Sequence, residues 1–380
     1  MNKTGQKILI ACDSSKSLID FRGKLIEEMA KTNNVSVFTP AITDQGVREI
    51  LNSLNVNVYE NKLTGSNVSV FADLKYICRL FILLIKVKPD IFFPYTFKPV
   101  IYGTFLAKLC RIKMITPMLT GLGYNFAENT ANSFVKTITR VLLKLSLLES
   151  KRLKIIFQNK DDCNTLHQCN ILTDKHETFV VNGSGVDLDH YIYSPPELIN
   201  VSFLMIARLI NAKGIAEYYE AAKRIKSYYP FIKFKLIGSY DDNIDSISPE
   251  LFNKIKFGNT ILYMGQVNDV RPYIKEASVV VLPSYYGEGV PRCLLESMAM
   301  GRAIITSDSV GCRETIENAR ATNGFLIPIK SVSALVSKME FYVNNRKAIL
   351  SYGLNGLAFA KKKFDVHLVN ADMLKIMQLN

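Results

Sequence analysis

Two glutamates separated by seven residues, Glu288 and Glu296, flank a short segment that contains Gly289. Carboxylates accept hydrogen bonds from hydroxyl groups, whereas glycine and the free N–H groups at a helix start favour a phosphate. A phosphorylated sugar, or a nucleotide with a ribose, carries both groups. An ordinary loop with solvated glutamates has the same pattern, so spacing alone leaves both interpretations open.

The elements around these glutamates are predicted from the apolar runs on either side. Residues 277–283 predict a buried parallel strand, and residues 303–306 predict a second one. Pro291 suits the first turn of the helix between them, and Gly301 suits the position just past its end. A strand, a glycine loop and a helix N-terminus therefore meet at one point.

A basic pair follows another predicted strand, residues 201–207. Arg208 comes directly after it, and Lys213 lies five residues further on. Ligands of α/β folds bind at the carboxyl ends of parallel strands. Arginine can clamp a phosphate through two donors, and lysine supplies a point charge. In a chain this basic, a solvated pair is the alternative.

Both segments resemble glycosyltransferase family 4, a family of retaining enzymes with the GT-B fold. The run EGVPRCLLESMAMGRAIIT, residues 288–306, is similar to its E-x7-E motif, and residues 208–214 are similar to its R-L-x-x-x-K-G motif. The resemblance implies an α/β architecture of two Rossmann-like parallel-sheet domains that face each other across a cleft. It also implies a C-terminal helix that returns to the first domain, expected here over about residues 358–378.

The resemblance also implies roles for residues of the second half. Glu288 would contact the transferred sugar, and Glu296 would accept from the ribose hydroxyls of the donor. The group that would stabilise the leaving diphosphate consists of Arg208, Lys213, Gly289, Val290 and Pro291. The segment expected to hold the base of a UDP-sugar is Gly265, Gln266 and Val267. Such cationic groups can replace a divalent metal, so we expect neither a metal nor another cofactor.

The first half departs from the family pattern. Many members have a histidine near the reacting sugar, but no histidine precedes His167 here. A glycine turn, TGLGY at residues 120–124, takes its expected place and includes Gly121. This turn resembles the bacterial subgroup that extends undecaprenyl-diphosphate-linked saccharides, which includes an N-acetylgalactosaminyltransferase. A simple loop is the alternative. Ser14, after the first strand, is expected to line the same site, and Arg22 either meets an acceptor phosphate or is a surface residue.

The 380 residues suffice for two domains, and strands alternate with helices throughout. The pattern predicts helices over 18–30, capped by Ser17, and over 312–318, and extended segments over 113–118, 234–237 and 324–327. We expect an N-terminal acceptor-binding domain over 1–192, a C-terminal nucleotide-sugar domain over 199–357, and the returning helix over 358–380. The seven cysteines include no C-x-x-C pair, which favours a reducing compartment. Residues 1–6 are polar and do not resemble a signal peptide.

The net charge of +13 predicts an anionic partner. Residues 134–156 mix apolar and basic side chains, so they either contact an anionic membrane or pack on a sheet. Residues 80–87 are too short to span a bilayer. The sequence has no recognised nucleic-acid motif, so we expect no nucleic-acid partner.

Together these features predict a retaining, metal-independent glycosyltransferase. It would move a hexose or N-acetylhexosamine from a UDP-sugar to a lipid-linked saccharide, peripherally at the cytoplasmic face of the membrane. The same donor chemistry on a soluble acceptor is the alternative, followed by a basic nucleic-acid-binding protein.

Overall fold

The computed structural model describes residues 5–61, 70–123, 126, 133–241, 245–317 and 321–379. The chain divides into two compact units. Unit 1 consists of residues 1–184 and 367–380, and unit 2 consists of residues 185–366. The sequence-based bounds lay at 192, 199 and 358, so unit 2 begins earlier and extends further than expected.

The main sheet of unit 1 is parallel, and its strand order is β3-β2-β1-β4-β5. A smaller parallel sheet has the order β6-β7-β8. The strands are β1 Lys7–Ala11, β2 Asn34–Pro40, β3 Asn57–Asn61, β4 Ile91–Pro94, β5 Met114–Ile115, β6 Met118–Leu119, β7 Lys154–Phe157 and β8 Glu177–Val180.

The sequence predicted one strand over residues 113–118, and this was wrong. β5 pairs with β4 in the main sheet, whereas β6 pairs with β7 in the smaller one. Pro117 lies between them and has no N–H to donate to a ladder. Its carbonyl accepts from the Ile156 N–H at 2.9 Å instead. The proline therefore marks the point where the chain changes sheets.

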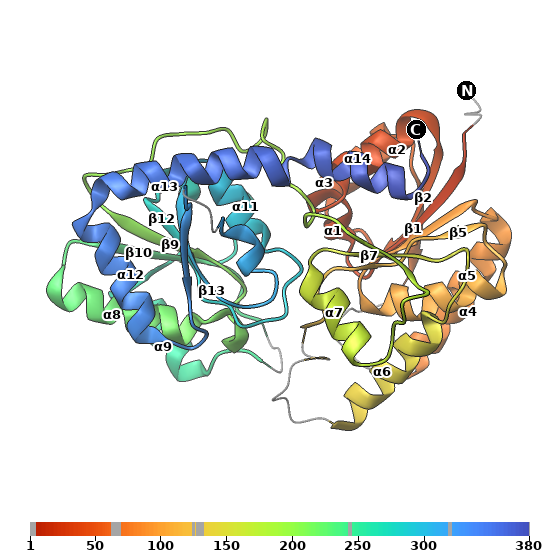
Figure 1. The fold of residues 1–380 in the computed structure, drawn as a ribbon, viewed down its shortest axis with the longest axis horizontal. Helices are drawn as coiled ribbons and strands as arrows, with labels where there is room; N and C mark the ends of the chain where they lie inside the picture. Colours follow the sequence, from red (N-terminus) through yellow and green to blue (C-terminus); the bar gives the residue numbers. More distant parts are fainter. Residues whose placement is uncertain are drawn as a thin grey trace. The chain divides into compact units, whose positions relative to one another are not determined.

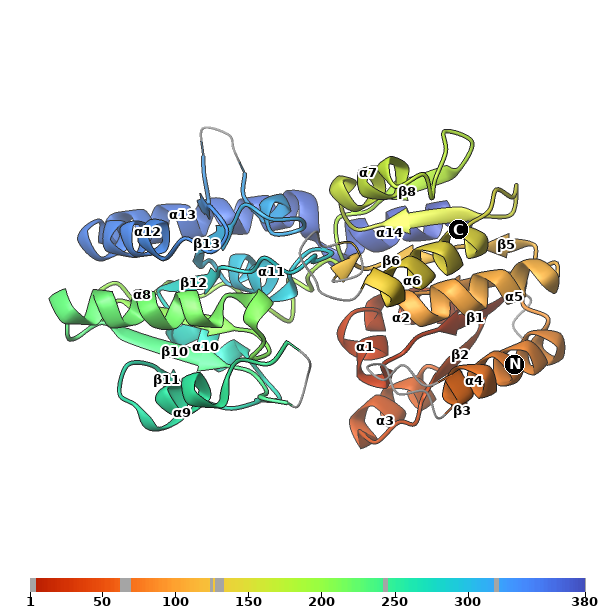
Figure 2. The same ribbon diagram turned by 90° about the horizontal axis from the view of Figure 1, so that it is seen from below.

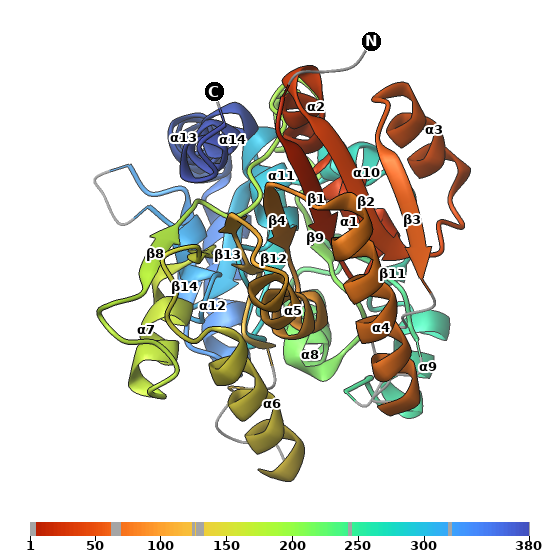
Figure 3. The same cartoon turned by 90° about the vertical axis from the view of Figure 1, so that its right-hand side faces the viewer.

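Helices cover both faces of the main sheet of unit 1. The helices of unit 1 are α1 Ser15–Asp20, α2 Gly23–Thr32, α3 Gln45–Ser53, α4 Val70–Val87, the π-helix η1 Pro99–Gly103, α5 Thr104–Leu109, α6 Ser133–Ser146, α7 Lys160–Gln168 and α14 Val366–Ile376. Of these, α7 contacts β7 and β8 of the smaller sheet. Leu9 and Ala11 of β1 share a core with α4, α5 and α6, which lie next to one another in Figures 2 and 3. Ile8 and Ile10 face the opposite core, which includes α2 and α14.

Residues 18–30 were predicted to form one helix capped by Ser17, but the structure has two helices there. Arg22 leaves the helical conformation, with φ −129° and ψ 1°, and α2 starts at Gly23. Ser17 lies inside α1, where its hydroxyl donates to the Ser14 carbonyl at 2.6 Å. The break turns the Arg22 side chain inward, and only 2% of it is exposed. Arg22 is therefore not a surface residue, which was one of the two alternatives that the sequence left open.

The single C-terminal helix predicted over 358–378 is also divided. α13 ends at Phe359, a π-helical turn spans Ala360–Phe364, and α14 starts at Val366. The N–H of Val186 donates to the Phe364 carbonyl at 2.7 Å, which holds the turn in unit 2. Met373 of α14 and Met377 just beyond its end are fully buried in the core of unit 1. The returning segment thus begins near residue 366.

Unit 2 contains a six-stranded parallel sheet of order β11-β10-β9-β12-β13-β14 (Figure 1). Its strands are β9 Ser202–Ile206, β10 Lys233–Ile237, β11 Leu262–Tyr263, β12 Val279–Leu282, β13 Ala303–Ser307 and β14 Gly324–Ile327. Its helices are η3 Asn211–Lys213, α8 Ile215–Tyr228, α9 Pro249–Phe257, α10 Arg271–Glu276, α11 Arg292–Ala299, η4 Arg313–Thr315, α12 Val332–Asn344, α13 Arg346–Phe359 and η5 Ala360–Phe364.

Two helices of unit 2 differ from the sequence prediction. α9 was not predicted, although Ser248 caps it by accepting from the Leu251 N–H at 3.2 Å and Pro249 occupies its first position. The helix predicted over 312–318 is only a single 3₁₀ turn, η4, and residue 318 lies outside the described residues. The α/β class and the two parallel-sheet units agree with the prediction.

Candidate active site

The central strands β9 and β12 of unit 2 lie side by side, with Phe203 opposite Val279. The chain order of the sheet reverses between them, and ligands of open α/β sheets bind at such a reversal. Arg208 and Lys213 follow β9, and Glu288 follows β12. The two predicted motifs therefore share one edge of the sheet.

Gly214 allows the two loops to meet. Its φ is +78°, and a Cβ placed there would lie 2.3 Å from the carbonyl oxygen of Pro283. The carbonyl of Ala212 accepts from the N–H groups of Tyr285 at 2.8 Å and Tyr286 at 3.1 Å. A residue other than glycine would separate these loops, because an L side chain has neither the space nor the favoured backbone conformation.

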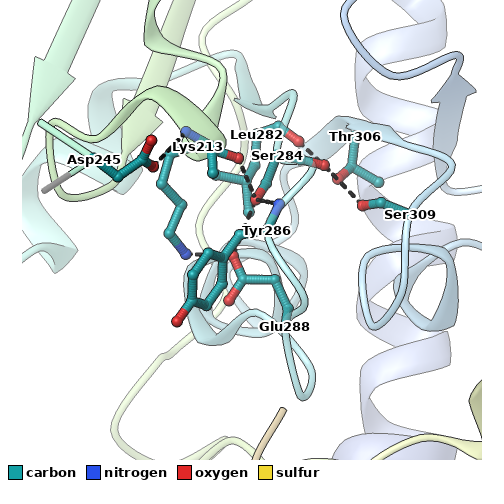
Figure 4. A network of polar contacts seen from close by, with 9 residues as sticks. Lys213, Asp245, Leu282, Ser284, Tyr286, Glu288, Thr306 and Ser309 are labelled. Atoms are coloured by element: carbon teal, nitrogen blue, oxygen red, sulfur yellow. Dashed lines mark hydrogen bonds and ion pairs between the residues drawn. The ribbon is translucent and has the colours of Figure 1, made fainter. Parts of the chain in front are cut away.

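Lys213 forms an ion pair with Glu288, and both side chains are largely buried (Figure 4). Ser284 donates to the same carboxylate at 3.1 Å, and the ammonium lies 5.3 Å from the centre of the Tyr286 ring. Burial alone would lower the pKa of Lys213, but the charge and the hydrogen bond of Glu288, with smaller contributions from Cys293 and Cys312, together outweigh burial, so the pKa is raised. Lys213 thus stays cationic at neutral pH.

Asp245 holds the η3 turn, Asn211–Lys213, in place. Its Oδ2 accepts from the N–H of Ala212 at 3.0 Å (Figure 4). Its carbonyl accepts from the Asn211 side chain at 3.1 Å. The sequence analysis did not identify Asp245, because no motif connects it to a segment more than 30 residues away in the chain. The conformation of η3 therefore depends on a residue beyond β10.

The start of α11 is held by a second loop. A Cβ on Gly311 would lie 2.3 Å from the carbonyl oxygen of Gly289, and Ser309 donates to the Ser284 carbonyl at 2.7 Å (Figure 4). Pro291 was predicted within the first turn, but it is the residue before the helix, which begins at Arg292. Gly289, Val290 and Pro291 are buried beside that start.

Glu296 lies inside α11 and is 7% exposed. Its Oε1 accepts from the Tyr191 hydroxyl at 2.9 Å and from Nε of Arg292 at 2.9 Å. Burial and the charge of Glu296 raise the pKa of Tyr191 well above its usual value, so the phenol remains a donor. The hydrogen bonds and the ion pair that Glu296 forms among the described residues are all made by Oε1. Tyr191 was not predicted.

Arg208 is exposed at the same edge. Among the described residues it forms no hydrogen bond or ion pair, although its charge acts on nearby Tyr286. Gly265 has a φ of +68° with no atom near its missing side chain, and its carbonyl accepts from the Gly238 N–H at 2.9 Å. Gln266 is exposed, and Val267 packs against the core of unit 2.

The two residues predicted in the first half lie in unit 1. Ser14 is exposed immediately before α1. Gly121 has a φ of +121° in the turn after β6, and Leu122 beside it donates its N–H to Asp162. Tyr124, the last residue of the predicted TGLGY turn, lies outside the described residues.

Unit 1 also has a polar cluster that the sequence analysis missed. Asp13 follows β1, Thr96 follows β4, and these neighbouring strands lie where the order of that sheet reverses. Lys98 pairs with Asp73 at 2.8 Å, and the Tyr102 hydroxyl donates to the same carboxylate at 3.0 Å. Thr96 has a φ of +69°, which is rare for a β-branched residue and common at functional sites. The position of Asp13 after the first strand was the available signal.

Among the residues that the structure describes, no group of three or more His, Cys, Asp or Glu side chains is arranged to hold a metal ion.

Comparison with known proteins agrees with this geometry. Residues 200–345 match the family model of glycosyl transferases group 1. The chain is 26% identical over 375 residues to the N,N'-diacetylbacillosaminyl-diphospho-undecaprenol alpha-1,3-N-acetylgalactosaminyltransferase of Campylobacter jejuni, covering 95% of each protein. It is 25% identical to the UDP-Gal:alpha-D-GlcNAc-diphosphoundecaprenol alpha-1,3-galactosyltransferase of Escherichia coli, over 72% of this chain and 71% of that protein.

Solved structures support the fold. Anabaena HepE in complex with UDP-glucose superposes with a TM-score of 0.77 at 17% identity, covering 98% of this chain and 99% of HepE. Sucrose-phosphate synthase from Thermosynechococcus elongatus gives the same TM-score and identity, with 98% of each chain covered. The matched motifs, the two parallel-sheet units and these relatives identify the chain as a glycosyltransferase of the GT-B fold, similar to family 4 enzymes, whose residues 200–345 match the glycosyl transferases group 1 model.

Proposed function

We propose that the protein is a retaining, metal-independent glycosyltransferase that moves a hexose or N-acetylhexosamine from a UDP-sugar to an undecaprenyl-diphosphate-linked saccharide. The observation that carries the donor half is the cluster of Arg208, Lys213, Glu288 and Glu296 around one sheet edge and one helix start. Cations and acceptors for hydroxyls are the two kinds of group that a sugar nucleotide requires.

The proposed chemistry follows from where charge develops. The bond between the sugar C1 and the diphosphate oxygen breaks, the acceptor oxygen bonds to C1, and the acceptor proton passes to the departing phosphate. Arg208 and Lys213 would stabilise the charge that builds up on the diphosphate, assisted by the N–H groups before α11. Glu288 would bind a hydroxyl of the sugar, and Glu296 would bind the ribose.

The acceptor half of the proposal rests on the relatives. The names of the Campylobacter and Escherichia enzymes specify diphosphate-linked undecaprenol substrates. In unit 1, Asp13 and Thr96 would bind hydroxyls of the acceptor saccharide, together with Ser14 and the turn at Gly121. Lys98 would contact its diphosphate, because an ammonium suits that charge. A lipid acceptor would place the enzyme peripherally on the membrane.

A donor panel tests the proposal. The purified protein is incubated with UDP-Glc, UDP-Gal, UDP-GlcNAc or UDP-GalNAc in EDTA, with and without a membrane lipid extract, and UDP release is measured. We expect release from one donor that requires the extract and survives EDTA. Release without the extract would indicate a soluble acceptor or hydrolysis. No release from any donor, despite UDP binding, would contradict the proposal.

Glu296→Ala provides the matched variant. Because a hydrogen bond to a charged group contributes about 1.5–3 kcal/mol, we expect at least about tenfold slower release at low donor concentration. Glu276→Ala is the control, since Glu276 is also ion-paired, to Lys235, but lies on α10 away from the site. Equal activity of the two variants would exclude the ribose role of Glu296.

A further inference from the structure

We propose that the outward faces of α4, α5 and α6 in unit 1 form one surface that docks on an anionic lipid bilayer. This deepens the proposed function, because an acceptor with a polyprenyl chain resides in such a bilayer.

Helix α4 is apolar on both sides. Tyr76 and Leu80 face inward and are buried in the core of unit 1. Leu74, Ile82 and Ile85 face outward, and at least half of each is exposed. A helix on the surface of a soluble domain normally has a polar outer face. The outward apolar residues of α4 therefore do not contribute to folding and indicate a contact with something else.

The neighbouring helices continue this pattern. On α5, Phe105 and Leu109 are one turn apart and exposed. On α6, Val141 and Leu145 are one turn apart and about half exposed, whereas Leu143 between them is buried. α5 contacts both α4 and α6, and the three lie next to one another in Figures 2 and 3. We call the outward apolar residues of these helices the three-helix face.

The charges on these helices select the partner. The three helices carry seven Lys and Arg residues and one acidic residue, Asp73. Asp73 is buried and paired with Lys98, so it does not offset the exposed positive charge. Lys75, Lys86 and Lys144 are exposed beside the apolar residues. Apolar side chains flanked by lysines match the boundary between acyl chains and anionic headgroups.

The depth of the contact is limited by the helices themselves. Within the described residues, no helix is long and apolar enough to cross a bilayer. The face therefore fits the bilayer surface. Its α4 end also carries Asp73, which joins Lys98 and Tyr102 in the polar cluster after β4. A lipid-linked acceptor could thus keep its chain at the three-helix face and its polar head at that cluster.

Vesicle flotation tests the inference without donor or acceptor. The full chain is mixed with vesicles of phosphatidylcholine, with or without phosphatidylglycerol. We expect flotation only with the anionic vesicles. Changing Leu74, Ile82 and Ile85 together to Gln should weaken it by more than about tenfold, because each apolar side chain contributes through its buried area. Changing Lys75, Lys86 and Lys144 to Gln should weaken it and flatten its salt dependence.

A control variant carries the same number of apolar-to-Gln changes at exposed residues of unit 2: Ile199, Phe231 and Phe257. It should float like the unaltered protein. Circular dichroism and UDP binding of every variant show that it is folded. Unchanged flotation of the α4 variant would overturn the inference. The inference would also be overturned if light scattering showed a dimer that the α4 substitutions dissociate, and if no form of the protein bound vesicles.

Turnover is measured separately, with a water-soluble short-chain analogue of the diphosphate acceptor. The α4 variant should keep its rate on this analogue and lose it on acceptor presented in anionic vesicles. Flotation without any turnover would reject the proposed function but retain the docking surface. If the α4 variant turns over both substrates as fast as the unaltered protein, the docking surface would be rejected and the proposed function retained.

Discussion

At the scale of single residues, the central feature is the buried ion pair of Lys213 and Glu288. Neither side chain is more than 14% exposed. Removing one partner leaves an unpaired charge in a poorly hydrated place. We therefore expect Lys213→Met to lower the free energy of unfolding by about 3–5 kcal/mol and to abolish turnover. Urea denaturation and UDP release measure the two effects.

The double variant Lys213→Met, Glu288→Leu separates folding from catalysis. Replacing both charges with apolar groups should restore most of the stability, since neither charge then remains buried alone. Turnover should stay absent, because the cation for the leaving diphosphate is gone. A double variant that regains turnover would contradict the role of Lys213.

Asp162 should make the free energy of unfolding of unit 1 depend on pH. Burial raises its pKa from 3.8 to about 7 in the folded chain. The folded state therefore holds this proton more tightly, so the contribution to stability is complete below pH 3.8 and is lost as the pH rises to about 7. Asp162→Asn should flatten the fall of unfolding free energy across that window, as measured by urea denaturation at several pH values.

Asp174→Asn is the control for this prediction, because Asp174 of unit 1 is exposed and is not among the groups that shift the pKa of Asp162. It should leave the pH profile unchanged. Equal profiles for the unaltered protein and Asp162→Asn would show that Asp162 titrates normally.

At the scale of elements, prediction succeeded where a short apolar run is buried on both faces. β9, β10, β12, β13 and β14 lie within the predicted ranges or differ by about a residue. Prediction failed where contacts with the rest of the fold decide where a strand or helix is interrupted. Pro117 divides a strand between sheets, and Arg22 ends a helix by turning into the core. Neither outcome can be read from local propensity.

Helix α14 should contribute to unit 1 through its buried methionine. Met373 is fully buried in the core that includes β1 and α2. Met373→Ala should lower the free energy of unfolding by about 2–5 kcal/mol, measured by urea denaturation. Leu368→Ala on the same helix is the control and should have little effect, since Leu368 is about half exposed. If both variants lost the same free energy of unfolding, α14 would stabilise unit 1 through its helix propensity alone and not through the burial of Met373.

The loop before α8 should tolerate no side chain. Gly214→Ala would bring a Cβ to 2.3 Å from the Pro283 carbonyl oxygen, so we expect lower stability and weaker UDP binding. Gly265→Ala is the matched control, because it shares a positive φ but meets no atom within 4 Å. This variant should lower the free energy of unfolding only through its strained backbone conformation, by about 1–2 kcal/mol. Thermal unfolding distinguishes the two variants, and equal losses of stability would contradict the steric argument.

At the scale of the whole molecule, all seven cysteines are free thiols. In the folded protein Cys78 and Cys169 are exposed, whereas Cys12 and Cys312 are buried. A thiol reagent should therefore modify Cys78 and Cys169 first and reach Cys12 and Cys312 only after unfolding. Mass spectrometry of partly labelled protein checks this order. Rapid labelling of Cys12 would indicate that the core of unit 1 opens readily.

The structure brings the predicted site residues together unevenly. Those of unit 2 lie at one sheet edge because their motifs occupy short segments after strands, such as Glu288 to Glu296. Tyr191 and Asp245 were missed because they reach the site from distant parts of the chain. In unit 1 the cluster around Asp13 and Lys98 depends on how strands pair, which a linear sequence does not display.

The return of the chain to unit 1 has a consequence for its synthesis. Unit 2 is one continuous segment, residues 185–366, whereas unit 1 needs residues from both ends of the chain. Because domains fold as they leave the ribosome, unit 2 can be completed before the last helix has emerged. The face of β1 that carries Ile8 and Ile10 waits for Met373 and Met377, which are translated after the whole of unit 2. Strand β1 is thus made before unit 2, but its core is completed only after unit 2.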